Sequence, residues 1–487
     1  MTLSYIPSDM NDEGILKATA SGSLPNGKPV IVNADGTVSV VAEVDQAIGS
    51  AAVFESAVSD VISTTFDSNL NKVVISYQDE GNSGYGTSVI GTVSGTSISF
   101  GTPVVFNSGN SDYISSNFDS NSNKVVIAYR DLGDAGKGKA IVGNVSGTGI
   151  SFGTEVEFNG ELEHTTVAFD SNSNKIVISY SDKSDGGEAG TSIVGTVSGT
   201  SISFGSAVVF AAPITRDVVS TFDSNSNKIV ISYRDGGNSQ AGTVIIGTVS
   251  GTSISFGNEV VFQVGAADLW TQSLVFDTSS NKVVIAYGNG ANSFHGTAIV
   301  GTVSGTSISF GTAVVFEAAS ITGVTTGGSY DASANRVVIS YRDTGNSSYG
   351  TLIAGLVSGT SISFESPVVF EAASTDDISS AYDSNSNKVV IAYKDVGNSN
   401  YGTSVVTTTG FTNLTAENYI GISTGGTYAS GSNATVKIIG NTSNEQSSLT
   451  AGQAYYVQRD GTIGTTAADP SVFAGTAISA TRLIVKT

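Results

Sequence analysis

A short acidic turn recurs along this sequence and has two possible chemical meanings. Its clearest copy places Asp119, Asn121 and Asn123 in DSNSN. Oxygen ligands at alternate positions suit Ca²⁺, whereas Asp and Asn side chains in turns also accept hydrogen bonds from their own backbone. Each copy offers one carboxylate and lacks the distal bidentate acid of an EF-hand. The pattern therefore favours a turn without a metal, and calcium binding stays open.

Catalytic patterns are missing from the sequence. His164 and His295 are the only histidines, no acid–base partner pattern lies near them, and we expect each on the surface or in a turn. No G-x-S-x-G elbow, P-loop or H-E-x-x-H occurs. A glycosidase generally needs two carboxylates about 5–10 Å apart, and the recurring Asp is too regular to be such a pair. The sequence predicts no enzyme, no catalytic residue and no cofactor.

Tyrosine, a basic residue and Asp occur together in several copies of a longer repeat. The triplets begin at Tyr129, Tyr233 and Tyr341 and read Tyr-Arg-Asp. Arg beside Asp at one place in these repeats indicates ion pairs between neighbouring blades. The fifth repeat reads Tyr-Gly-Asn from Tyr287, so the triplet is not obligatory, and we interpret it as structural.

Composition limits the possible partners. The 487 residues contain 42 acidic and 21 basic side chains and no Cys. Binding to nucleic acid phosphates needs clustered Lys and Arg, so nucleic acid is excluded as an expected partner. No apolar run reaches the length of a membrane span. The start, MTLSYIPSDMNDEG, lacks the basic and apolar regions of a signal peptide. We expect a cytosolic protein or one released by another route.

A repeat of about 50 residues fills most of the chain. Each copy has an aromatic residue followed by Asp, and the copies are 52, 51, 53, 54, 54 and 52 residues apart. The aromatic anchors are Phe66, Phe118, Phe169, Phe222, Phe276, Tyr330 and Tyr382. Within a copy, apolar runs between Gly and Asn turns predict four antiparallel strands, and the Val-Val-Ile run of the second is expected between neighbouring sheets. Seven such units predict an all-β, seven-bladed β-propeller, with a β-solenoid as the rival fold.

The two ends of the repeat array complement each other. Residues 49–67, GSAAVFESAVSDVISTTFD, match residues 101–119, GTPVVFNSGNSDYISSNFD, so a fourth strand precedes the first anchor. The last copy leaves at TTTG, residues 407–410, before its own ISFGTPVVF strand. An N-terminal strand that completes the last blade closes the ring and removes the open sheet edges. We therefore predict a closed propeller over residues 47–409.

The flanks, residues 1–46 and 410–487, share a different pattern. LPNGKPVIVNADGTV, residues 24–38, and LTAGQAYYVQRDGTI, residues 449–463, both fit L-x-x-G-x-x-[VY]-x-V-x-x-D-G-T-[VI]. Asp-Gly pairs suit tight hairpin turns, so each flank is predicted to be a small β module. Because closure of the ring brings the chain ends together, we expect the flanks to pack into one base. Two independent modules are the alternative.

Binding is best sought where the blade architecture leaves the sequence free. The fourth-to-first connections vary most between copies, from ESAVSD to QVGAADLW, and share a face with the second-to-third turns. Exposed aromatic side chains suit sugar stacking or protein contacts. The candidate ligand-binding residues are Trp270, in a variable connection, and Tyr85, Phe294, Tyr349 and Tyr401, in one slot of the second-to-third turn. The alternative is that these rings are buried between blades or pin the turns.

Three segments resemble proteins of one kind. LTAGQAYYVQRDGTIGTTAADPSVFAGTAISATRLIVKT resembles the terminal module of structural and tail-fibre proteins of marine tailed bacteriophages. ATASGSLPNGKPVIVNADGTVSVV is similar to attachment segments of such proteins, and the repeat resembles repeats of large virion proteins. These segments cover nearly the whole chain, and their motifs are structural. The resemblance implies a protein of the virion, surrounded by other virion proteins, that lysis releases without a signal peptide.

The sequence thus predicts a phage fibre or decoration protein. Its propeller would contact a glycan or protein of the host surface, or neighbouring virion subunits. We expect no metal site and no membrane insertion, and a homo-oligomer stays open. A purely architectural capsid decoration protein is the first alternative, and a glycan-degrading phage enzyme is the second.

Overall fold

The computed structural model describes residues 14–486, except residues 34, 185, 213, 266–267, 323–326, 416 and 469. The side chains of residues 268–271 and 322 are also not described. The chain forms two compact units, one of residues Ala47–Thr409 and one that joins Met1–Gln46 to Gly410–Thr487. In the described part of the chain, no helix has the length and apolar character needed to cross a bilayer.

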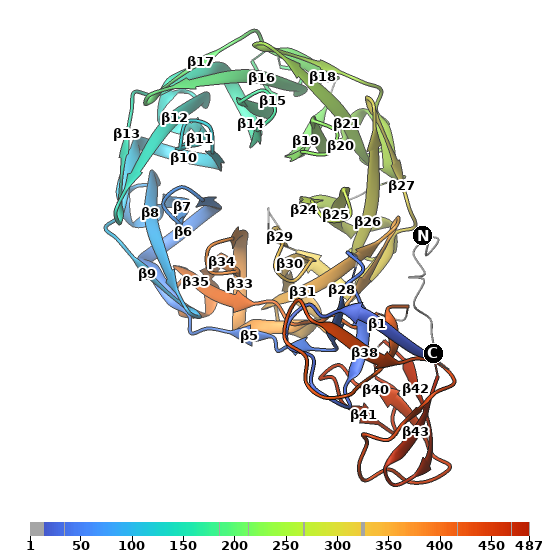
Figure 1. The fold of residues 1–487 in the computed structure, drawn as a ribbon. Coiled ribbons are helices and arrows are strands. Elements are labelled where there is room, and N and C mark those ends of the chain that lie inside the picture. The colour runs from blue at the N-terminus through green and yellow to red at the C-terminus, as the bar shows by residue number, and fades with distance from the viewer. Residues whose placement is uncertain are drawn as a thin grey trace. The chain divides into compact units, whose positions relative to one another are not determined.

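The unit of residues Ala47–Thr409 is a ring of seven antiparallel blades (Figure 1). A central channel lies between the innermost strands. The innermost strands are β6 (Ala52–Asp67), β10 (Val104–Asp119), β14 (Val156–Asp170), β19 (Thr215–Asp223), β24 (Asp268–Asp277), β29 (Gly328–Asp331) and β33 (Val368–Asp383). The second strands, which number the blades from 1 to 7, are β7 (Lys72–Asp79), β11 (Lys124–Asp131), β15 (Lys175–Asp182), β20 (Lys228–Asp235), β25 (Lys282–Asn289), β30 (Arg336–Asp343) and β34 (Lys388–Asp395). The third strands are β8 (Tyr85–Ser94), β12 (Lys137–Ser146), β16 (Ala189–Ser198), β21 (Ala241–Ser250), β26 (His295–Ser304), β31 (Tyr349–Ser358) and β35 (Tyr401–Thr408). The all-β propeller predicted from the repeat is confirmed.

The outer edge of each blade consists of two pieces, so the single fourth strand predicted from ISFGTPVVF is wrong. The first pieces are β9 (Ser97–Phe100), β13 (Gly149–Phe152), β17 (Ser201–Phe204), β22 (Ser253–Phe256), β27 (Ser307–Phe310) and β32 (Ser361–Phe364). The second pieces are β18 (Val208–Ala211), β23 (Val260–Gln263), β28 (Val314–Thr322) and the first halves of β6, β10, β14 and β33. Both pieces pair with the third strand, as Val93↔Ile98 and Thr87↔Val105 show for blade 1. The residues between them interrupt the edge, which shortens the row of unpaired backbone groups.

The variable fourth-to-first connections are strands in five places, where the sequence suggested loops. β10 leaves its partner β8 at Asn110 and pairs with β11 from Ser111 onward. At this exchange the Ser111 N–H donates to the Gly84 carbonyl, 2.9 Å away. β6, β14, β28 and β33 run on in the same way. The backbone needs no loop because it changes partners without losing its hydrogen bonds.

The N-terminal strand closes the ring, as predicted. β6 and the short β5 (Ala47–Ile48) pair with β35 and supply the outer edge of the last blade. The pairs Thr403↔Val53 and Ser404↔Ala52 repeat the register of Thr87↔Val105 and Ser88↔Val104 in blade 1. A strand from the start of the array thus occupies the position that, in the other blades, is filled by the strand that follows the third strand.

Adjacent blades pack through apolar side chains on both faces of the second strand. In β7, Val73 and Ile75 contact Val390 of blade 7, whereas Val74 belongs to the cluster around Ile127 of blade 2. All of them are 0–1% exposed. The unbroken Val-Val-Ile run is thus explained by burial on two sides, and each large aliphatic side chain contributes about 1.5–3 kcal/mol.

A tyrosine of each second strand joins two blades. The seven fully buried tyrosines are Tyr77, Tyr129, Tyr180, Tyr233, Tyr287, Tyr341 and Tyr393. Each ring packs against a phenylalanine from the outer edge of the preceding blade, as Tyr129 does with Phe106 at a centroid distance of 5.1 Å. The phenylalanine needs a glycine on the third strand, because a Cβ at Gly86 would fall on the Phe106 ring. The Gly of the Tyr-Gly-Thr motif and the Phe of the Val-Val-Phe motif therefore encode one contact, between the third strand and the outer edge of the same blade.

The recurring acidic turns are hydrogen-bonded within themselves. Asp119 Oδ1 accepts from the backbone N–H groups of Asn121 and Ser122 at 2.9 and 3.0 Å, and Asn123 has a left-handed φ of 53°. The other six copies repeat this arrangement. The turn interpretation of D-x-N-x-N is confirmed.

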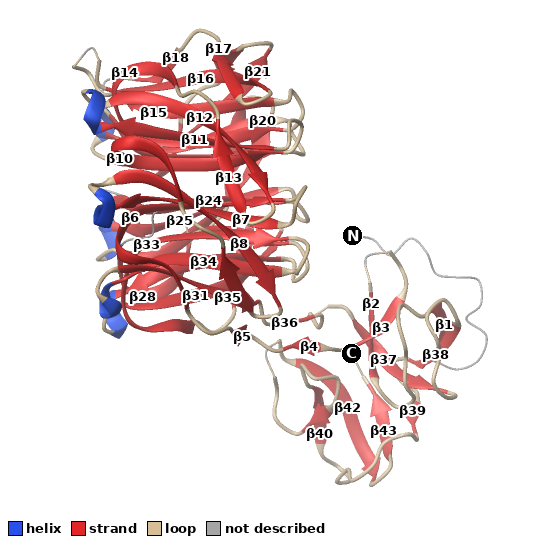
Figure 2. Cartoon of the chain, turned by 90° about the vertical axis from the view of Figure 1, so that its left-hand side faces the viewer, coloured by secondary structure: helices blue, strands red, loops and turns tan. Residues whose placement is uncertain are grey.

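The two faces of the ring differ. One carries the six 3₁₀ turns found among the described residues, and we call it the 3₁₀ face (Figure 2). These turns are η1 (Glu80–Asn82), η2 (Leu132–Asp134), η3 (Gly236–Asn238), η4 (Gly290–Asn292), η5 (Thr344–Asn346) and η6 (Val396–Asn398). The opposite face, the hairpin face, carries the acidic turns and the Ser-Gly-Thr turns.

The other unit combines both chain ends. Its first sheet consists of β1 (Ile15–Thr19), β38 (Asn433–Lys437), β37 (Tyr419–Thr424), β2 (Pro29–Val32) and β3 (Val38–Val40), and a short pair joins β4 (Glu43–Val44) to β36 (Phe411–Thr412). Its second sheet consists of β39 (Thr442–Ser443), β43 (Arg482–Val485), β42 (Val472–Ser479), β40 (Ala454–Val457) and β41 (Ile463–Gly464). The two Asp-Gly-Thr motifs form matching turns, since Asp35 and Asp460 each accept the backbone N–H two residues later at 2.9 Å. β1 pairs with β38, and β2 pairs with β37 as well as with its hairpin partner β3, so strands from both flanks form one unit.

Candidate functional site

The aromatic candidates from the sequence do not meet at one point. The Trp270 side chain lies outside the described residues. Tyr85, Tyr349 and Tyr401 begin the third strands of three different blades and are half-buried. Phe294 is 40% exposed, but it does not share their slot.

The pairing of the strands shows why Phe294 was misplaced. His295 pairs with Asn289 just as Tyr85 pairs with Asp79, so His295 occupies the tyrosine slot. Phe294 precedes the strand and has a left-handed φ of 60°. Both turns have the same length, so Phe294 corresponds to Gly84 and His295 to Tyr85, an alignment that motif matching overlooked.

A bulge in the innermost strands places varied side chains around the mouth of the channel on the 3₁₀ face. In β10 the pairing shifts between Asp112 and Ser115, and similar shifts occur in β6, β14, β19 and β33. The residues that adopt left-handed φ at these bulges are Val61, Tyr113, His164, Asp217 and Asp377, with values of 45–52°. Such values are uncommon for residues other than Gly, and bulges often re-aim side chains at functional sites. The channel lining begins within three residues of each bulge.

Arg130 is the centre of a cluster that joins blades 2 and 3. Its Nε and Nη2 donate to the Asp112 carboxylate at 2.7 and 2.5 Å. The guanidinium lies over the Tyr113 ring, 4.6 Å from the centroid, and Nη1 is 3.4 Å from Glu163 of the next blade. Lys183 Nζ also approaches Glu163, at 2.9 Å. Arg130 of the Tyr-Arg-Asp triplet therefore forms the predicted ion pair between blades.

His164 lies inside this cluster, so its expected place on the surface or in a simple turn is wrong. Its side chain is 11% exposed and stacks on Tyr113 with ring centroids 4.8 Å apart. Nδ1 is 3.5 Å from Asp217 of blade 4, which also pairs with Arg234 at 2.7 Å. Burial, together with nearby arginines, lowers the pKa of His164 to about 4. The imidazole is therefore neutral near pH 7 and belongs to the interior of the protein.

A second cluster spans blades 6, 7 and 1. Lys394 Nζ lies 2.5 Å from Asp60 and 3.7 Å from Asp377, and Arg342 lies 3.7 Å from Asp376. Burial raises the pKa of Asp377, and the neighbouring Asp376 and Asp60 raise it further. These pairs also join blades, because Asp60 and Asp376 belong to the blades that follow Lys394 and Arg342.

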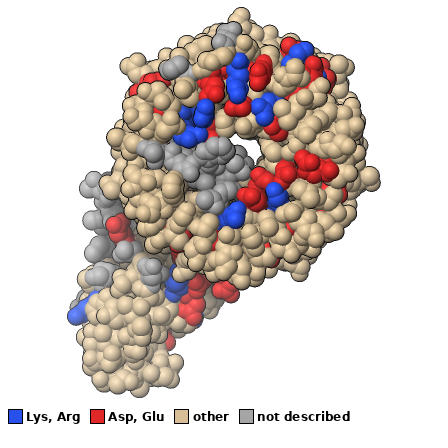
Figure 3. Space-filling model, turned by 180° about the vertical axis from the view of Figure 1, so that it is seen from behind, with Lys and Arg blue, Asp and Glu red and all other residues tan. Residues whose placement is uncertain are grey.

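The charges around the channel mouth largely cancel. Figure 3 shows basic and acidic side chains gathered around the opening on this face. Arg216 pairs with Glu188 at 2.9 Å and adds to the first cluster, in which four basic residues face four acidic ones. In the second cluster two basic residues face three acidic ones. The described residues contain no group of three or more His, Asp or Glu side chains arranged to hold a metal ion.

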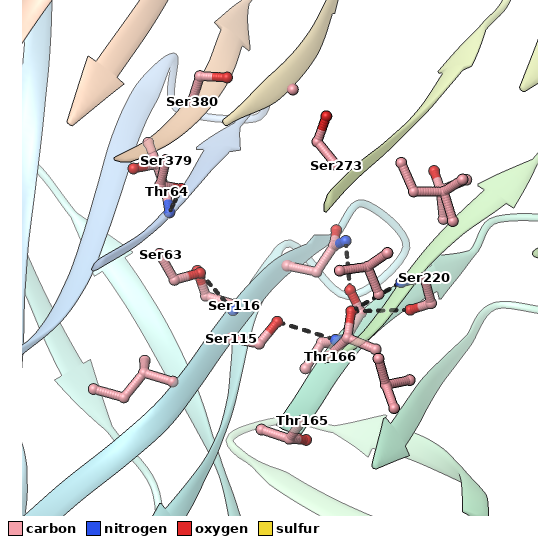
Figure 4. Close-up of a pocket in the computed structure, with 18 residues that line it drawn as sticks. Ser63, Thr64, Ser115, Ser116, Thr165, Thr166, Ser220, Ser273, Ser379 and Ser380 are labelled. Atoms are coloured by element: carbon pink, nitrogen blue, oxygen red, sulfur yellow. Dashed lines mark hydrogen bonds between the residues drawn. The ribbon is translucent and has the colours of Figure 1, made fainter. Parts of the chain in front are cut away.

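The channel itself is lined by hydroxyl groups. A cavity of about 230 Å³ lies between the innermost strands, and its lining combines Ser and Thr with aliphatic residues (Figure 4). Several hydroxyls cross from blade to blade. Ser63 Oγ lies 3.0 Å from Ser116 Oγ and accepts from the Ser116 N–H, and Thr166 Oγ1 lies 3.1 Å from Ser220 Oγ. Because the innermost strands do not pair with each other, these hydroxyls satisfy backbone groups that a neighbouring strand would otherwise satisfy.

Motif searches on the sequence missed the bulge residues. Tyr113, His164 and Asp217 stand at equivalent positions but differ in type, so no motif marks them. A usable signal lies in the strand length, since Ser59↔Asp79 and Ser63↔Ser76 leave one residue too many on β6.

Comparisons with known proteins support the fold. No family model matches the chain, and no curated protein matches it. The BP39L lectin from Burkholderia pseudomallei superposes with a TM-score of 0.53 at 11% identity, over 74% of this chain and 99% of the lectin. The periplasmic gluconolactonase PpgL of Pseudomonas aeruginosa gives 0.46 at 10% identity over 74% and 97%. A protein of unknown function from Dyadobacter fermentans gives 0.45 at 11% over 76% and 99%. At these identities the similarity shows the fold alone. Among these three structures only BP39L has a TM-score above 0.5, so the support for the fold rests on BP39L.

Proposed function

We propose that this chain is a bacteriophage virion protein whose propeller binds a glycan of the host surface through its 3₁₀ face. The observation that carries the proposal is the difference between the two faces of the ring. On the hairpin face the acidic and Ser-Gly-Thr turns repeat almost without change. On the 3₁₀ face the bulge residues are of four types in five blades, namely Val61, Tyr113, His164, Asp217 and Asp377. Variation that the blade does not require is expected where a ligand is recognised.

The chemistry of the mouth favours an uncharged or weakly charged ligand. The charged side chains of the two clusters are paired with one another, so few of these side chains remain to attract a phosphate or a cation. Glycans are recognised by hydrogen-bonding groups and aromatic rings together, and this face offers Tyr113 beside a hydroxyl-lined channel. BP39L is called a lectin, and it shares the fold.

The virion location and the display role follow from the resemblance of the repeat and the flanks to phage structural proteins. In this proposal the unit built from both chain ends attaches the protein to the particle. The propeller is a rigid carrier, closed by its own N-terminal strand, and has no catalytic task. A purely architectural role remains the main alternative and predicts that neither face binds host cells.

Two matched triple variants test the proposal. Asn82→Arg/Asn238→Arg/Asn398→Arg places bulky cations on exposed turns of the 3₁₀ face in blades 1, 4 and 7. Ser68→Arg/Ser224→Arg/Ser384→Arg places the same cations on exposed hairpin-face turns of the same blades. Binding of the purified protein to host cells should fall at least tenfold for the first variant and less than twofold for the second. Equal effects, or no binding by the wild type, would reject a binding role for the 3₁₀ face.

A cryo-EM map of the particle tests the location. The ring at a tail or fibre tip with its 3₁₀ face outward agrees with host binding. A ring in the capsid lattice, or one whose 3₁₀ face meets a neighbour, indicates an architectural protein. Absence of the chain from particles contradicts the virion assignment.

A further inference from the structure

The central channel has a chemistry distinct from that of its mouth. None of the described residues that line the cavity is charged. The lining alternates hydroxyl-bearing residues with aliphatic ones such as Ile114, Val167 and Leu274. An anion would need basic side chains, and a cation would need carboxylates, so this lining suits neither. It suits a neutral molecule with both hydroxyl groups and C–H faces.

Four hydroxyls of the lining are left without a partner: Thr64 Oγ1 and three hydroxyls from residues that are almost fully buried. Thr165 Oγ1, Ser273 Oγ and Ser380 Oγ have no hydrogen bond in the described structure, and their residues are 9%, 2% and 8% exposed. They come from blades 3, 5 and 7, and all line the same cavity (Figure 4). A buried hydroxyl without a partner is unfavourable, so such groups usually meet water or a ligand. The neighbouring Ser63, in contrast, is already paired across the blades.

The size of the cavity limits the ligand. Pockets for drug-sized molecules measure about 300–1,000 Å³, and this one measures about 230 Å³. One sugar ring is of suitable size, whereas an oligosaccharide must extend through a mouth. Because the lining begins next to the bulges, we expect the sugar to enter the channel through the mouth on the 3₁₀ face.

We infer that the channel receives one neutral sugar unit, the terminal residue of the glycan that the 3₁₀ face binds. The inference rests on the proposed glycan-binding function and adds the ligand class and the position. The hydroxyls of Thr165, Ser273 and Ser380 exchange hydrogen bonds with the sugar hydroxyls, and the aliphatic side chains contact its C–H face. Recognition by hydroxyls from three blades requires the closed ring.

Saturation-transfer NMR on the full chain tests the inference. The probes are the methyl glycosides of glucose, galactose, mannose and fucose, with sialic acid as a charged comparison. The variant Thr165→Val/Ser273→Ala/Ser380→Ala removes the three hydroxyls with little change in shape. Its control, Thr196→Val/Thr248→Val/Thr302→Val, removes three unpartnered hydroxyls from third strands outside the channel. At least one neutral glycoside should bind the wild type and the control, and its affinity should fall at least tenfold in the channel variant.

The outcomes separate this inference from the proposed function. Host-cell binding with no neutral glycoside signal, or a signal that the channel variant keeps, overturns the channel site and leaves glycan binding by the face intact. Preference for sialic acid overturns the neutral ligand class. If the wild type binds neither host cells nor any glycoside, the proposed function itself is overturned. Circular dichroism checks the fold of each variant, and Thr165→Val alone repeats the test with the smallest change in packing.

Discussion

Replacing Gly205 with alanine would test how closely neighbouring blades approach each other. Gly205 follows β17 and faces the Ser-Gly-Thr turn of the next blade. An added Cβ would lie 2.9 Å from the carbonyl carbon of Thr252 and 3.0 Å from its Cβ, with the carbonyl oxygen nearer still. No left-handed φ is involved at Gly205, so the whole effect is steric. Backbone atoms cannot turn aside as a flexible side chain can, and the blades must separate.

The sequence contains a natural control for this prediction. Gly49, Gly101, Gly153, Gly257 and Gly311 meet the next blade in the same way, but blade 6 has Glu365 at this position. The blade that follows it lacks a Ser-Gly-Thr turn, because the chain enters the other unit after Thr409. Glu365 therefore has room for its side chain, which lies 3.5 Å from Arg336.

The expected magnitude follows from the packing. Overpacking in a well-packed interior costs about 1–3 kcal/mol, and we expect about 3 kcal/mol here because backbone opposes backbone. For a unit of about 360 residues, an unfolding entropy of about 2.1 cal/mol/K per residue converts this to a Tm lowered by about 4 °C. Glu365→Gln, which keeps a side chain and a hydrogen-bonding partner for the buried Arg336 at this position, should change Tm by no more than about 1 °C. Thermal unfolding followed by circular dichroism measures both, and a Gly205→Ala protein as stable as the wild type would refute the clash.

Three further perturbations have expected outcomes. Arg130→Met should lower the free energy of unfolding by about 3 kcal/mol, because it leaves partly buried carboxylates unpaired. The Arg216 side chain is 39% exposed, so Arg216→Met should lower the free energy of unfolding by about 1 kcal/mol or less. Denaturant titration distinguishes them, and equal losses would contradict a structural role for the inner cluster. His164 has a folded pKa of about 4, below its usual 6.5, so its contribution is present above pH 6.5 and is lost as the pH falls toward 4. Between pH 7 and 4 the wild type should lose about 3 kcal/mol more than His164→Tyr, and parallel pH curves would contradict the burial of a neutral imidazole. Tyr233→Phe should cost about 1 kcal/mol, because the 2.7 Å bond to Glu259 is lost, and an unchanged chemical denaturation midpoint would contradict this contribution.

The repeat also explains much of the acidity of the chain. The seven Asp carboxylates that follow the aromatic anchors accept backbone N–H groups in the hairpin turns. Four of the Asp carboxylates that end second strands accept backbone N–H groups at the start of 3₁₀ turns. These acids stabilise turns, so the formal charge of −21 overstates the acidity of any binding surface. Composition alone could not separate the two roles, because the location of a carboxylate depends on the fold.

The sequence by itself determined the architecture. The spacing of the anchors, the Val-Val-Ile runs and the acidic turns are local signals repeated seven times, and the missing fourth strand of the last copy indicated closure. Those signals suffice because hydrogen bonds and burial within a blade depend on nearby residues.

Only the tertiary structure decided where the functional groups lie. It showed that variable connections such as residues 107–112 are strands, that His164 is buried against Tyr113, and that His295 rather than Phe294 shares the slot of Tyr85. These facts depend on contacts between blades about 50 residues apart in sequence. A bulge redirects a side chain without leaving a motif, so the mouth of the channel became visible only in the closed ring.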